Sequence, residues 1–144
     1  MTNSEKAIAC FDNKYNCSQA VFSTFSEQLG LSREIALMIG TGFGAGLGFS
    51  GNLCGAVSGA AMVLGLKHGM ANSENQGAKD NTYSLTRKFI KRFETKHSSI
   101  ICRDILGVDL GEPGGKEKAI EKNLFNTVCR DCVRTAVEIL EEIL

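Results

Sequence analysis

The sequence lacks an excess of charge of either sign. Its 16 basic residues balance 16 acidic ones along 144 positions, which leaves no electrostatic case for a nucleic-acid partner or an anionic membrane surface. The first residues, MTNSEKAIACFDN, also lack the basic region and following apolar stretch of a signal peptide. We therefore expect a cytoplasmic protein, in which lasting structural disulfides are rare.

Charged residues are missing altogether between positions 35 and 66. This stretch is longer than the roughly 20 residues that span a bilayer. Nine glycines interrupt it, however, and Ser50 and Asn52 lie near its middle. Irregular backbone cannot face lipid without losing its hydrogen bonds. The stretch therefore predicts two buried helices joined by a glycine-rich loop, and no membrane span.

Alternating strand patterns are absent, and helical spacing of apolar residues dominates. Asn16 and Gln19 have the spacing of a capping box at the start of one helix. The predicted helices are residues 4–11, 17–29, 33–41, 53–68, 74–96, 98–106 and 127–144, with a turn region at 107–118. We predict an all-α fold: one domain, residues 1–144, forming a bundle of about six to eight helices.

Four cysteines fall close to the starts of predicted helices: Cys17, Cys54, Cys102 and Cys129. Amides in the first turn of a helix lack intrahelical partners and carry the positive end of the helix dipole. Both effects favour the thiolate, the form that attacks disulfides and binds metals. We predict that these four thiols converge on one site, and that each takes part in its chemistry.

The remaining two cysteines, Cys10 and Cys132, fit a different role. Free cysteine is often buried as a small apolar residue, and Cys132 lies within the apolar stripe of the last helix. The only C-x-x-C motif, CRDC at 129–132, lacks the βαβ setting of a thioredoxin. Separations of 37, 48 and 27 residues between the four cysteines do not resemble zinc knuckles.

The remaining motifs are weaker evidence of a function. GLGFSG at 46–51 matches the dinucleotide fingerprint, but no strand precedes it and no acidic residue follows before Glu74. No Ser–His–Asp or paired-carboxylate arrangement can be argued. The two histidines, His68 and His97, could be ligands or acid–base partners, although a histidine at a helix end is more often a surface group.

The segments YNCSQAVFSTF, GNLCGAVSGA, ICRDILG and VCRDCVRTAVEIL occur in this order and together resemble the C_GCAxxG_C_C family of redox-active proteins. The resemblance covers nearly the whole chain, and C-G-A-x-x-G is Cys54–Gly59. It implies that the family's four cysteines are Cys17, Cys54, Cys102 and Cys129, and that the chemistry is redox or cluster chemistry. Cys10 and Cys132 are additions to the family pattern.

We favour the first of three functions and leave the other two open as alternatives. The first is an electron-transfer centre in which the four cysteines ligate an iron–sulfur cluster or another metal, with Gly51, Gly55 and Gly59 bringing backbone donors close. The second is metal-free thiol–disulfide exchange with Cys54 as nucleophile. The third is a non-catalytic module that binds a metal or a partner. The redox partner is unidentified, and the glycine-rich helix surface is compatible with a homodimer or a monomer.

Overall fold

Helices make up all the regular secondary structure, as the residue pattern predicts. The computed structural model describes residues 1–144, with α1 (Asn3–Asp12), α2 (Cys17–Ser26), α3 (Arg33–Gly40), α4 (Gly55–His68), α5 (Gln76–His97), α6 (Cys102–Leu106), α7 (Gly115–Glu121) and α8 (Arg130–Ile143). Two 3₁₀ turns, Glu27–Leu29 and Thr41–Phe43, follow α2 and α3, and a π-helical turn, Phe125–Cys129, leads into α8. The predicted all-α class is confirmed.

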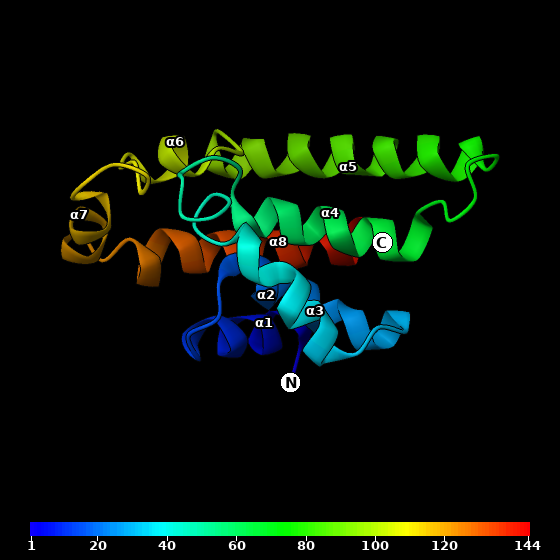
Figure 1. The fold of residues 1–144 in the computed structure, drawn as a ribbon, viewed down its shortest axis with the longest axis horizontal. Helices are drawn as coiled ribbons and strands as arrows, with labels where there is room; N and C mark the ends of the chain where they lie inside the picture. The colour runs from blue at the N-terminus through cyan, green and yellow to red at the C-terminus, as the bar shows by residue number, and fades with distance from the viewer.

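Helices α4 and α8 lie side by side at the centre of the bundle (Figure 1). The long helix α5 packs on one side of them, α1 and α2 pack on the other side, and α3 packs on α2. Helices α2, α4 and α8 begin, and α5 ends, at the same end of the molecule, where α6, α7 and the glycine-rich loop also lie. The fold therefore gathers several helix ends in one region.

The core between these helices is made of aromatic and branched side chains. Phe25 of α2, Leu64 of α4, Phe89 and Phe93 of α5 and Leu140 of α8 are almost completely buried. The rings of Phe89 and Phe93 stack with their centroids 5.8 Å apart. Burying each such side chain contributes about 1.5–3 kcal/mol, so this core holds the helices rigidly enough to position groups at their ends.

Helix boundaries follow the local capping chemistry. The predicted capping box is present: the Gln19 amide donates to Asn16 Oδ1 at 2.9 Å, and the Asn16 amide donates to Gln19 Oε1 at 2.9 Å. Helix α5 starts later than predicted, because Asn75 accepts from the Ala78 amide and acts as its cap.

Two features of the bundle differ from the prediction. Helix α7 lies partly in the region expected to be a turn, because residues 116–121 are good helix formers once Gly114 has turned the chain in a left-handed conformation. Helix α4 is buried as predicted, but α3 is not. Met38 is 69% exposed, since α3 packs on α2 through one narrow face that contains Ala36 and Gly40. None of the helices is both long and apolar enough to cross a bilayer.

Candidate redox site

Five of the six cysteines line one cavity at the end of the bundle where α2, α4 and α8 begin. The cavity has a volume of about 280 Å³, and its cysteines are Cys17, Cys54, Cys102, Cys129 and Cys132. The other lining residues are mainly apolar, and include Phe11, Tyr15, Phe49, Ile105, Leu106, Leu110 and Phe125. The structure thus brings together all four cysteines that we predicted to converge, and adds a fifth.

Cys54 and Cys102 are held side by side by backbone hydrogen bonds. Leu53 and Ile101 form an isolated antiparallel bridge. The Cys54 amide donates to the Ile100 carbonyl at 2.8 Å, and the Cys102 amide donates to the Asn52 carbonyl at 2.6 Å. Because the bridge lies directly before both helices, it fixes the starts of α4 and α6 against each other.

The start of α4 lies two residues later than predicted. Cys54 itself occupies the N-cap position, and the Asn52 side chain accepts a hydrogen bond from Arg103 Nη1 at 2.8 Å. The Cys54 carbonyl accepts from the Val57 and Ser58 amides at 3.0 and 3.1 Å, and its side chain makes no capping hydrogen bond.

Cys17 is the first residue of α2, and two contacts place it in the cavity. The side chains of Asn16 and Gln19 not only cap α2 but also donate to carbonyl oxygens of Leu37, Gly40 and Thr41, at the end of α3. On the other side, a Cβ on Gly55 would lie 3.1 Å from the Cys17 Cβ. The missing side chain of Gly55 therefore allows the start of α4 to approach Cys17.

Cys129 does not lie in the first turn of its helix, so that prediction is wrong. It ends the π-helical turn, and its amide donates to the Leu124 carbonyl, five residues back, at 3.1 Å. The positive φ of Asn123 ends α7, and helical backbone resumes immediately after it. Asn126 caps nothing and donates to the Asn123 side chain instead. A π-turn shifts the face of the residues it contains, and here Cys129 lines the cavity.

Cys132 is a site residue that the sequence interpretation missed. We assigned it to the apolar stripe of the last helix, and it is indeed buried, but it faces Cys54 across the cavity. The signal was present in the CRDC motif, because residues three apart share one face of a helix. Cys10, in contrast, lies outside the cavity and contacts Ser23 Oγ at 3.8 Å.

The cysteines fall into two interacting pairs with unequal acidity. The Cys132 thiol, as a hydrogen-bond donor to the Cys54 thiolate, lowers the pKa of Cys54 despite its burial. The amides of Ala56 and Val57 lower it further. The same hydrogen bond raises the pKa of Cys132. In the second pair, a hydrogen bond to Cys129 raises the pKa of Cys17, and burial acts in the same direction.

Cys102 stands apart from both pairs. Burial raises its pKa to about 12, and the nearby Cys54 and Cys129 sulfurs act in the same direction. Cys102 therefore stays protonated at neutral pH. Among the thiols whose pKa is shifted, Cys54 alone is favoured as thiolate. The six cysteines are all free in this structure.

The glycine-rich segment shapes the wall of the cavity. Three residues of the loop before α4, Ala45, Leu47 and Phe49, have positive φ although they are not glycine. Such backbone costs about 1–3 kcal/mol per residue and persists only where the surroundings impose it. Ala45 and Phe49 line the cavity. The centroid of the Phe49 ring also lies 5.8 Å from Nζ of Lys116 on α7, so the loop contacts α7.

The three glycines that we expected to hold a cofactor occupy different places. Gly55 lines the cavity, whereas Gly51 and Gly59 do not. A Cβ on Gly59 would meet the Ser18 carbonyl oxygen at 2.8 Å, so this glycine permits close packing of α2 and α4. Gly51 has a positive φ and lies against Asp109. As they stand, no three His, Cys, Asp or Glu side chains are grouped to hold one metal ion.

Comparison with known families agrees with this site. The model of the C_GCAxxG_C_C family, described as "Putative redox-active protein", matches residues 15–143. The chain belongs to this family. The C_GCAxxG_C_C match spans every cysteine that lines the cavity, and a redox-active role is what the family description assigns. A search of curated proteins and a search of solved structures each found no match to the chain.

Proposed function

We propose that this protein catalyses thiol–disulfide exchange, with Cys54 as the nucleophile and Cys132 as the resolving thiol. One observation carries the proposal: Cys54 and Cys132 line the same apolar cavity, and the neighbouring Cys132 thiol lowers the pKa of Cys54. A thiolate that is stabilised by a neighbouring thiol is prepared to attack a disulfide, and the neighbour is placed to complete the exchange.

The exchange takes place in two steps. The Cys54 thiolate attacks one sulfur of a substrate disulfide, forms a mixed disulfide with it, and releases the other half of the substrate as a thiolate. Cys132 then loses its proton and attacks the Cys54 sulfur, which releases the second substrate thiolate. The protein dithiol is oxidised by two electrons to a Cys54–Cys132 disulfide, and the substrate disulfide is reduced to two thiols.

Reaction with glutathione disulfide as the probe tests this proposal. Reduced protein is mixed with the probe, quenched with acid, alkylated and mapped by mass spectrometry. We expect a Cys54–Cys132 disulfide that dithiothreitol reverses, and its loss in Cys54→Ser. The matched control is Cys10→Ser, which removes the one cysteine outside the cavity and should leave the disulfide unchanged. Absence of this disulfide in the unaltered protein would refute the proposal.

An iron–sulfur cluster is the second candidate, and the donor set supports it. Five cysteines around one apolar cavity offer four thiolates, with no histidine or carboxylate among the lining residues. Cys17, Cys54, Cys102 and Cys129 would be the ligands, and side chains would have to regroup around the cluster. Anaerobic purification followed by iron and sulfide assays and visible absorption tests this. A colourless protein without iron would exclude the cluster, and zinc at one per chain would favour a non-catalytic metal module.

A further inference from the structure

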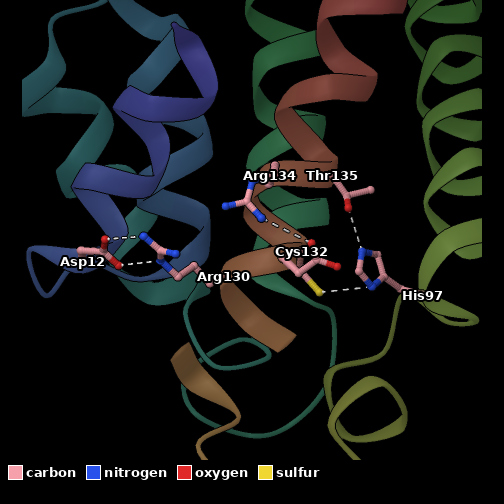
Figure 2. Close-up of polar contacts among 7 residues, drawn as sticks. Asp12, His97, Arg130, Cys132, Arg134 and Thr135 are labelled. Carbon is pink, nitrogen blue, oxygen red and sulfur yellow. Dashed lines mark hydrogen bonds and ion pairs between the residues drawn. The ribbon is translucent and has the colours of Figure 1, made fainter. Parts of the chain in front are cut away.

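His97, at the end of α5, lies beside the Cys132 thiol (Figure 2). Its Nδ1 is 3.8 Å from Cys132 Sγ, and its Nε2 is 2.9 Å from Thr135 Oγ1. The imidazole also packs on the ring of Phe93, with centroids 4.8 Å apart. Three contacts from two helices therefore hold this ring with one nitrogen toward the redox pair.

The two contacts fit either neutral tautomer of the ring, because a hydroxyl and a thiol can each donate or accept. A neutral imidazole carries one N–H and one acceptor nitrogen. Once Cys54 is in the mixed disulfide it is no longer a thiolate acceptor, so the single hydrogen of the Cys132 thiol is free to point to His97 Nδ1. The ring then carries its own hydrogen on Nε2, which donates to Thr135 Oγ1. Thr135 is buried on α8, one turn beyond Cys132. In the mixed-disulfide state its hydroxyl oxygen accepts from Nε2–H, and the basic Nδ1 of His97 faces the thiol.

His97 also reaches a second, polar cavity on the other side of Cys132. This cavity has a volume of about 410 Å³ and is lined by His97 together with Asn126, Thr127, Arg130, Asp131 and Arg134, among others. It is distinct from the apolar cavity, which His97 does not line. The imidazole therefore connects a buried thiol with a polar groove from which a proton can be exchanged with water.

We propose that His97 is the general base that takes the proton of Cys132 in the resolving step, and that Thr135 is the residue that positions it. This inference rests on the thiol–disulfide exchange proposed above. As the Cys132 sulfur forms its bond to Cys54 Sγ, its proton moves to His97 Nδ1 and the substrate thiolate leaves. The imidazolium then gives the proton to water in the polar groove.

The charges around His97 are compatible with this role. Burial lowers the pKa of His97, the Asp131 carboxylate opposes that shift, and Lys96 adds to it. Arg134 also lines the groove, but it pairs with Asp131 at 3.6 Å, and Arg130 is engaged with Asp12 on α1. Since the pKa lies below the ordinary value of 6.5, the ring is neutral at pH 7 and able to accept a proton.

The test separates the two steps of the exchange. The protein is mixed with 2,2′-dithiodipyridine, and rapid quenching with mass spectrometry follows first the mixed disulfide on Cys54 and then the Cys54–Cys132 disulfide. In His97→Gln we expect the second step to slow by about 10²-fold, a typical contribution of general base catalysis. Thr135→Val, which keeps the shape but removes the acceptor, should slow the same step less. The matched control is His68→Gln, at the far end of α4, which should change neither step.

The pH dependence of the second step gives a readout that packing alone would not alter. In the unaltered protein the rate should fall as the pH drops through the pKa of His97, below 6.5, and level off above it. In His97→Gln the rate should instead keep rising into the alkaline range. An unchanged second step in folded His97→Gln would overturn the inference. Failure to form the Cys54–Cys132 disulfide in the unaltered protein would instead overturn the exchange itself.

Discussion

Cys132 lines the same cavity as Cys54 and lowers its pKa, although one residue lies in the last helix and the other caps α4, far away in the sequence. The two sulfurs respond in opposite directions, since the pKa of Cys54 is lowered and that of Cys132 is raised. In the proposed exchange, this asymmetry makes Cys54 the attacking thiol and Cys132 the resolving one.

Removing the donor thiol should make Cys54 less reactive. Cys132→Ala deletes the hydrogen bond that contributes most to the lowered pKa of Cys54. A hydrogen bond to a charged group contributes about 1.5–3 kcal/mol, so alkylation of Cys54 by iodoacetamide at pH 7 should slow by about tenfold. Cys132→Ser, which keeps a hydroxyl donor, should stay near the rate of the unaltered protein. Equal rates in the Ala and Ser variants would contradict this assignment.

Two glycines of α4 should respond in opposite ways to alanine. A Cβ on Gly59 would lie 2.8 Å from the Ser18 carbonyl oxygen, whereas a Cβ on Gly65 would meet nothing within 4 Å. We expect Gly59→Ala to lower the free energy of unfolding by about 1–3 kcal/mol through overpacking. Gly65→Ala should raise it by about 0.5–1 kcal/mol, because alanine favours helix. Urea unfolding measures both, and a stabilising Gly59→Ala would show that α2 and α4 are not packed this closely.

Alkaline pH should destabilise the protein through its buried thiols. The folded state holds the Cys102 proton up to a pKa of about 12, whereas the ordinary value is 9.0. Above pH 9 the unfolded chain releases this proton and the folded chain does not, so the stability contributed by Cys102 is lost as the pH rises toward 12. Cys17 and Cys132 act in the same direction.

The variant Cys102→Ala measures how much of this alkaline loss of stability is due to the Cys102 thiol. Urea midpoints measured at pH 7, 9 and 10 should decline less steeply above pH 9 in the variant than in the unaltered protein. Parallel declines would show that the Cys102 thiol ionises as easily in the folded chain as in the unfolded one.

The ion pair between Asp12 and Arg130 should contribute only at pH values where Asp12 is ionised. Arg130 Nε and Nη2 donate to the Asp12 carboxylate at 3.0 and 2.9 Å, and the bond lowers the pKa of Asp12 from 3.8. The stabilisation is therefore present above about pH 4 and is lost as the pH falls through the folded pKa. Because the pair is exposed, we expect it to be small.

Comparison of Asp12→Asn with the unaltered protein checks this assignment. The variant should have a slightly lower urea midpoint at pH 7, and the difference should vanish near pH 2, where both side chains are neutral. A difference that persists at low pH would point to a packing role for Asp12 rather than a charge effect.

Local chemistry explains what could be predicted along the chain. The capping box of Asn16 and Gln19 places Cys17 at the first position of α2, because side-chain caps satisfy the free amides of the same turn. The stop of α6 at Gly107, in the left-handed conformation, follows from the same kind of local rule. Boundaries failed where a residue had a distant partner, as Asn52 does with Arg103.

The sequence by itself determined the helical class and most helix positions, since periodicity, capping and residue type act within a few positions, and its resemblance to the C_GCAxxG_C_C family indicated the four cysteines of that family. Only the tertiary structure decided that Cys132 faces Cys54, that a π-turn carries Cys129 to the cavity, and that His97 and Thr135 lie behind the pair. These relationships depend on the angles and separations at which α4, α5 and α8 pack. Packing is set by the shape of the whole core, and no short stretch of residues encodes it.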